Sequence, residues 1–215
     1  AEAHPGELQF QRAGGQRRGA RTVGDGAARA EEFGDAADAG GGLLQILESL
    51  GLRALEIPTS PQQGISVEAL DLALRTHDRI RAVVVMPNFH NPLGSVMPDA
   101  EKEKLVRLCE RQRIALIEDD TYGALGPDDV PLKAAKAWDR SGSVIYCASL
   151  RKTLAPGLRL GWVAGGRWQA RIHMIKYAQS RANEVLAQYT VAEFMASSAY
   201  DRHMARLRRM LNVQR

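Results

Sequence analysis

The sequence predicts an α/β fold, with a largely parallel sheet and flanking helices. From Leu43 onward, short runs rich in β-branched residues alternate with amphipathic helical runs, which is the pattern of an α/β protein. The run RAVVVMP at 81–87 is continuously apolar after its arginine, as in strands buried on both faces of a parallel sheet. The 215 residues, 45% hydrophobic and 25% charged, are enough for one sizeable core.

Residues 1–42 have a different composition from the rest. They hold ten of the twenty glycines and five arginines, with no apolar period of 2 or 3.6. Such a stretch buries too little apolar surface to offset the entropy lost on ordering. We therefore expect residues 1–42 to be irregular or disordered, and the folded part to span residues 43–215.

The first half of this folded part predicts three helices and two strands. LLQILESLG reads as a helix that ends at Gly51, and VEALDLALRTH is amphipathic. The third helix has acidic residues in its first turn and Arg111 and Arg113 in its last, which suits the helix dipole. In order, the expected elements are helix 43–51, strand 52–58, helix 67–77, strand 81–87 and helix 98–113.

The second half predicts three more strands and then only helices. IALIED, SVIYCAS and LGWVAGG are short and rich in β-branched or aromatic residues, so we expect strands at 114–119, 143–149 and 160–166. From about Trp168 the pattern is helical, with one helix over 189–199 and a final basic helix from Tyr200.

Charge and cysteine usage exclude little but favour a cytoplasmic protein. The formal charge of +4 is small, and its basic residues gather near the two ends, so it does not by itself indicate nucleic-acid binding. Cys109 and Cys147 lie in apolar runs without metal-ligand or disulfide spacing, so we expect reduced, buried thiols and no metal site. No apolar run approaches the roughly 20 residues that span a bilayer, so no membrane association is expected.

Polar residues follow three of the predicted strands. The segments are NFHNPLG at 88–94, EDDTYG at 118–123 and SLRKTLAPGLR at 149–159. Ligands in open α/β sheets collect beyond the carboxyl ends of strands, so these segments are expected to meet. Each has a simpler reading as a turn, a helix cap or a solvated lysine. Together they supply an amide, carboxylates, a phenol, a lysine and an arginine, which suit an anionic heteroaromatic aldehyde.

This succession is similar to the fold-type I pyridoxal-phosphate enzymes of aminotransferase class I/II. The texture of 98–125 and 200–211 most resembles the aminotransferase-like domain of MocR-type regulators of the GntR superfamily, with 2-aminoadipate-type aminotransferases nearby. The resemblance covers roughly Leu43 to the C-terminus. It implies that residues 43–215 are an incomplete large domain of the pyridoxal-phosphate-dependent transferase fold.

The resemblance also implies a role for six residues. Lys152 would be the catalytic, Schiff-base lysine. Asp119 would pair with the pyridine nitrogen, and it is preferred over Asp120 because it lies three residues before Tyr122, as in the family pattern. The phenolic oxygen of the cofactor would be held by Tyr122 and Asn91, and its phosphate by Ser149 and Arg159. The expected set that binds pyridoxal 5'-phosphate is Asn91, Asp119, Tyr122, Ser149, Lys152 and Arg159.

The sequence departs from the family pattern in three places. Arg151 stands where the family usually has a small hydroxyl residue before the lysine. Residues 1–42 do not match the family's phosphate loop or its ring-stacking aromatic. The family's substrate-binding arginine and the winged-helix domain of a MocR regulator have no counterpart in the sequence. We therefore expect a truncated chain that would contact DNA only through a domain absent from it.

Three functions stay open at this point. The first is a MocR-like transcriptional regulator whose cofactor senses an amino-acid or amine effector, and the second is a fragment of a free-standing aminotransferase of the 2-aminoadipate type. The third is a remnant that has lost the cofactor. Catalytic activity is left undecided, and a homodimer is possible because family members commonly pair.

Overall fold

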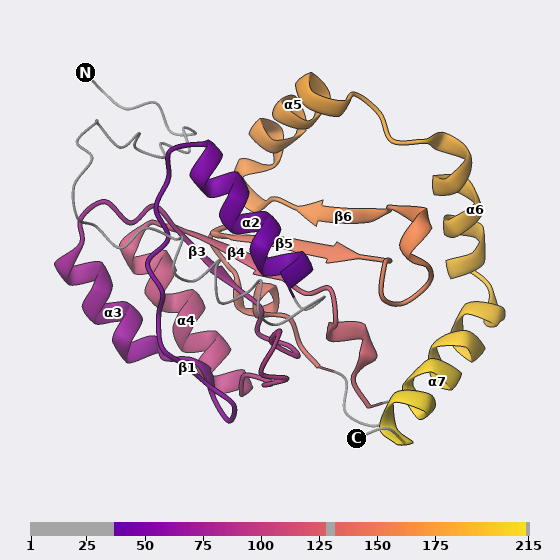
Figure 1. Ribbon diagram of the computed structural model, residues 1–215, viewed down its shortest axis with the longest axis horizontal. Helices are drawn as coiled ribbons and strands as arrows, with labels where there is room; N and C mark the ends of the chain where they lie inside the picture. The colour runs from indigo at the N-terminus through magenta and orange to yellow at the C-terminus, as the bar shows by residue number, and fades with distance from the viewer. Residues whose placement is uncertain (1–36, 128–131, 214–215) are drawn as a thin grey trace.

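The computed structural model describes residues 37–127 and 132–213 (Figure 1). Residues 1–36, most of the segment expected to be irregular, lie outside the described ranges. Helix α2 (Ala37–Ser49) begins at Ala37 rather than at the expected Leu43. Gly51 follows it with a φ of 68°, a left-handed conformation that glycine adopts without strain.

The central sheet has four strands in the order β3–β4–β5–β6. They are β3 (Ala82–Val85), β4 (Ala115–Asp119), β5 (Val144–Ser149) and β6 (Gly161–Ala164). The first three run parallel, with Val83 opposite Leu116 and Ile117 opposite Ile145, whereas β6 pairs antiparallel with β5. The expected largely parallel sheet is confirmed.

Two expectations about strands are wrong. Residues 52–58 form no strand, because the only pairing the described residues make nearby joins β1 (Thr59–Ser60) to β2 (Gly64–Ile65). The expected burial of β3 on both faces also fails, since Val84 is 42% exposed while Val83 and Val85 are buried. One face of β3 packs on helices, and the side chain of Val84 lies on the other face.

Helices cover the sheet as the sequence pattern indicated. α3 (Val67–Thr76) and α4 (Asp99–Gln112) match the helices expected at 67–77 and 98–113. Ser66 caps α3 by accepting a hydrogen bond from the backbone N–H of Ala69 at 3.1 Å. The chain after β6 is helical, as expected, although with different bounds. It forms α5 (Gln169–Ser180), α6 (Val185–Met195) and α7 (Ser198–Val213).

The main core lies between the sheet and the pair α3 and α4. It includes Leu105 and Leu116, both 0% exposed. A smaller cluster on the opposite face packs Trp168 against Ile145. Cys109 lies in the main core, and burial raises the pKa of its thiol to about 12, so this thiol stays protonated at neutral pH. No helix among the described residues is both long and apolar enough to cross a membrane.

Candidate functional site

The parallel strands β3, β4 and β5 end at one edge of the sheet, and the three polar segments begin there. Asp119 and Ser149 are the last residues of β4 and β5. Tyr122 precedes the short 3-10 helix η1 (Gly123–Leu125). Lys152 lies in the turn after β5, and Asn91 lies in the loop after β3. Chain topology therefore brings these segments to a common edge.

The turn after β5 presents Lys152 to solvent. Its neighbours Leu150 and Thr153 are each only 4% exposed, whereas Lys152 is exposed. The backbone N–H of Leu154 donates to the carbonyl of Leu150 at 2.9 Å, and this bond closes the turn. Nζ of Lys152 lies 5.7 Å from the centroid of the Tyr122 ring. Two of the six predicted residues are thus in direct contact.

Ser149 and Arg159 line a second feature of this edge, a hollow of about 300 Å³. Arg151 and Gly161 also border it. Arg159 ends the 3-10 helix η3 (Pro156–Leu158) with a φ of 51°. Oγ of Ser149 accepts the backbone N–H of Arg151 at 3.2 Å, so its own hydroxyl proton can be donated to another group. The hollow thus combines a hydroxyl donor with guanidinium groups, which are the donors that bind a phosphate.

Asp119 and Asp120 differ in their surroundings. Oδ1 of Asp119 accepts from Thr121, at 3.0 Å from its backbone N–H and at 2.6 Å from its hydroxyl. Asp120 instead accepts from Nδ2 of Asn88 and from the hydroxyl of Tyr146, both at 2.9 Å. Burial raises the pKa of Asp120, and these two hydrogen bonds oppose that rise. Both carboxylates are half-buried, but Asp120 bonds to side chains of two other segments, whereas among the described residues Asp119 bonds only to the neighbouring Thr121.

A buried polar network beneath the site escaped the sequence reasoning. Asn88, Lys102 and Glu118 are each at most 1% exposed. Nζ of Lys102 donates to the carbonyl of Lys133 at 2.8 Å, and Nδ2 of Asn88 reaches the same oxygen at 3.3 Å. Glu118 accepts backbone N–H groups from Ala135 at 2.6 Å and from Lys136. This network fixes residues 133–136 behind the ends of β3 and β4.

Glu118 predicts a specific pH dependence of stability. Burial raises its pKa from 4.5 to about 7, although the two backbone N–H bonds favour the charged form. A raised folded-state pKa means that folding favours the protonated carboxyl. Its contribution is therefore complete below pH 4.5 and is lost as the pH rises through 7.

We expect the unfolding free energy of the wild type, relative to that of Glu118→Gln, to fall by on the order of 3 kcal/mol over this pH range. Urea unfolding of both proteins between these pH values measures the difference, in which the other titrating groups largely cancel. A difference that stays constant with pH would contradict the buried carboxyl.

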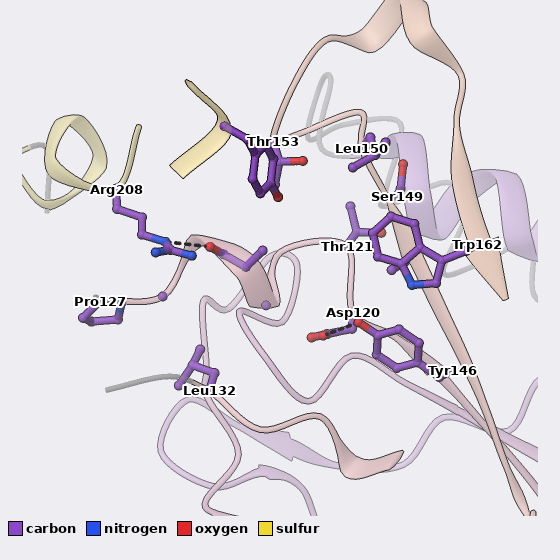
Figure 2. Close-up of a pocket in the computed structure, with 15 residues that line it drawn as sticks. Asp120, Thr121, Pro127, Leu132, Tyr146, Ser149, Leu150, Thr153, Trp162 and Arg208 are labelled. Atoms are coloured by element: carbon purple, nitrogen blue, oxygen red, sulfur yellow. Dashed lines mark hydrogen bonds between the residues drawn. The ribbon is translucent and has the colours of Figure 1, made fainter. Parts of the chain in front are cut away.

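Figure 2 shows a further hollow of about 290 Å³ beside the site. The Asp120–Tyr146 hydrogen bond lies on one side of it, together with Trp162, and Thr153 and Arg208 approach from other sides. Oγ1 of Thr153 is buried without a partner among the described residues. The described residues form no cluster of three or more side chains suited to a metal ion.

Comparison with known proteins gives a consistent set of similarities. The family model of class I and II aminotransferases matches residues 42–214. The HTH-type transcriptional regulator YjiR of Escherichia coli is 42% identical over 169 residues, which are 79% of this chain and 36% of that protein. The chain thus spans about 36% of the length of its curated relatives.

Two solved aminotransferases share the fold. The kynurenine aminotransferase of Pyrococcus horikoshii, in complex with PMP and KYN, aligns with a TM-score of 0.71 at 27% identity, over 77% of this chain and 42% of its own. The α-aminoadipate aminotransferase LysN of Thermus thermophilus, complexed with N-(5'-phosphopyridoxyl)-L-leucine, aligns with a TM-score of 0.65 at 25% identity. That alignment covers 74% of this chain and 41% of LysN.

Proposed function

The chain belongs to the class I and II aminotransferase family, and from that premise we propose that it is the cofactor-binding core of a helix-turn-helix transcriptional regulator, with pyridoxal phosphate on Lys152. The observation that carries the proposal is the 42% identity to a regulator over most of the chain. Residues 43–215 would form part of a large domain. DNA would be contacted by another domain, and the regulator would act in the cytoplasm, as a possible homodimer.

The residues at the sheet edge fit this cofactor. The exposed amine of Lys152, which lies beside the Tyr122 ring, suits a covalent link to the cofactor aldehyde. The hollow at Ser149 and Arg159 offers charge-assisted donors for a phosphate. Asp119, a carboxylate at the end of β4, suits a protonated pyridine nitrogen. The donor set thus contains one group for each functional part of the cofactor.

When bound, pyridoxal phosphate supplies an aldehyde that links covalently to amines and a ring that withdraws electrons from a substrate carbon. Lys152 would present its neutral amine to that aldehyde and then hold or move the proton at the α-carbon of an amino acid. Asp119 would keep the proton on the pyridine nitrogen. Asn91 and Tyr122 would orient the phenolic oxygen. The same residues could bind an amino-acid or amine effector without completing a reaction.

A free-standing aminotransferase is the second candidate, favoured by the 0.71 TM-score to a kynurenine aminotransferase. A DNA-binding domain in the intact protein would decide for the regulator. Both candidates require the cofactor, so one experiment tests what they share. The chain is incubated with pyridoxal phosphate, reduced with borohydride and digested. We expect the adduct on the peptide that contains Lys152; an adduct on another lysine, or none, would refute the proposal.

Replacing Asp119 and Asp120 by asparagine, one at a time, distinguishes a role in cofactor binding from a role in stabilising the fold. Asp119→Asn keeps the Oδ1 acceptor for Thr121 but loses the charge, so we expect weaker cofactor retention and an unfolding free energy within about 0.5 kcal/mol of the wild type. Asp120→Asn disturbs the bonds to Asn88 and Tyr146 and should cost about 1–2 kcal/mol of stability. Dialysis of bound cofactor and urea unfolding measure the two effects. Equal cofactor loss in both variants would sink the choice of Asp119.

A further inference from the structure

Helix α7 makes hydrogen bonds to both of the segments that carry Lys152 and Tyr122. His203 contacts the carbonyl of Thr153, the residue after Lys152, at 2.7 Å through Nε2. Nε of Arg208 donates to the carbonyl of Ala124 at 2.9 Å, a bond that Figure 2 draws as a dashed line. One helix far along the sequence therefore touches both turns of the candidate site.

The ring of His203 is held in a fixed orientation. A carbonyl oxygen can only accept, so we assign the proton of this bond to Nε2. Phe194 of α6 contacts the His203 ring at a centroid distance of 6.2 Å and the Tyr200 ring at 5.9 Å, both edge to face. Met204, the next residue of α7, is 3% exposed. The Phe194 contact with the His203 ring and the burial of Met204 thus limit the movement of α7 against Thr153.

The sheet does not by itself fix the distance between the two turns. The pairing of β4 with β5 ends at Asp119 and Cys147, followed by one more bond from the backbone N–H of Asp120 to the carbonyl of Cys147. Beyond it, β5 pairs only with β6, so no backbone bond of the sheet, among the described residues, joins the Lys152 turn to the Tyr122 turn. The contacts of α7 lie five residues apart, which is roughly 7.5 Å along a helix. Nζ of Lys152 lies 5.7 Å from the Tyr122 ring. A segment of α7 of roughly 7.5 Å can therefore bridge the Lys152 turn and the Tyr122 turn.

We propose that His203 is a positioning residue, which holds the Lys152 turn against the Tyr122 turn from helix α7. The proposal rests on the proposed function, because it gives the position of Lys152 its purpose. His203 touches no reacting atom and acts through the Thr153 carbonyl. A displacement of α7 would then shift the amine of Lys152 relative to the residues of β4, so α7 also offers a route by which the site can be regulated.

The test uses the full 215-residue chain and three variants. His203→Leu removes the N–H donor, and His203→Gln keeps one at a similar reach. His173→Leu, at an exposed histidine of α5, is the matched control. Hydrogen exchange is measured on peptides covering 150–158 and, as a core reference, 115–119. The rate of borohydride trapping of pyridoxal phosphate on Lys152 is the second readout.

We expect His203→Leu to raise exchange in 150–158 and to slow trapping by about tenfold each, with unchanged exchange in 115–119. His203→Gln should recover both to near the wild-type rates. The proposal is overturned if His203→Leu behaves as His173→Leu does, or if His203→Gln loses turn protection while the core keeps its own. Should His203→Leu loosen the core as well, the Gln variant alone decides.

The two proposals fail in different ways. If the wild type traps no cofactor on Lys152, the proposed function fails. Hydrogen exchange still tests whether His203 holds the turn that carries Lys152. If residues 150–158 lose exchange protection in His203→Leu and regain it in His203→Gln, the positioning role of His203 is supported even then. Normal trapping on Lys152 that no His203 variant changes would instead leave the function intact and reject the positioning role.

Discussion

Gly161→Ala is expected to destabilise the protein by about 2–3 kcal/mol and to abolish the proposed phosphate binding in the hollow at Ser149. A Cβ added at Gly161 would lie 2.4 Å from the carbonyl oxygen of Ala148, a backbone atom of the neighbouring strand. Gly161 pairs with Ser149 at the end of β5, and both border the hollow. The methyl group must therefore push β6 away from β5 where the proposed phosphate donors lie.

Gly157→Ala is the matched control for this prediction. Gly157 lies in η3, four residues before Gly161, and an added Cβ there meets no atom within 4 Å. Its unfolding free energy should stay within about 0.5 kcal/mol of the wild-type value. Urea unfolding of both variants measures stability. Phosphate binding in the hollow is measured by how strongly inorganic phosphate inhibits the trapping of the cofactor. Equal stability and equal phosphate competition in the two alanine variants would contradict the prediction, because β6 would then accommodate the added methyl group without loss of stability.

The apolar pattern of the sequence predicted the strands of the central sheet, but it did not predict which segments find a pairing partner. The apolar runs of β4 and β5 are buried strands because each lies between two neighbours, as continuous apolar sequence indicates. Residues 52–58 are apolar apart from Arg53 and Glu56, but a strand also needs a partner, and none of the described strands pairs with them. Exposure of Val84 has the same origin, because burial on the second face depends on what packs there and not on the strand itself.

The candidate site could be predicted from the sequence, but the buried polar network beneath it could not. Lys152 and Ser149 stood out because their segment follows a strand and matches a family motif. Lys102 lies in the stretch EKEKL, whose charges are typical of a solvated helix face, yet Lys102 is 1% exposed. Its amine donates to the carbonyl of Lys133, which is 31 residues away in the sequence. Such a contact is a property of tertiary packing, which no local period encodes.

Lys152→Arg should abolish the borohydride-fixed cofactor adduct, with a stability change below about 0.5 kcal/mol. Arginine keeps a cation beside the Tyr122 ring, but its guanidinium stays protonated and forms no stable link to an aldehyde. Because Lys152 is exposed, little packing is lost. Mass spectrometry of the reduced, digested protein measures the adduct, and Lys176→Arg on α5 is the control that should retain it.

The loss should be complete because the other five lysines are bound to oxygen atoms. Lys102 and Lys136 donate to backbone carbonyls and face carboxylates, Lys104 pairs with Glu101, and Lys133 pairs with Asp99. Lys176 donates to the carbonyl of Arg181. To attack an aldehyde, each of these amines would first have to leave its oxygen partner.

Within the described ranges, the amine of Lys152 lies over the Tyr122 ring, whereas the other five lysine amines lie against oxygen atoms. An aromatic ring accepts no proton, and it leaves the nitrogen lone pair accessible once the amine is neutral. An adduct that persists at full yield in Lys152→Arg would therefore mean that one of the oxygen-bound lysines leaves its partner to react. The motif would then have identified the sheet edge correctly but the wrong nucleophile.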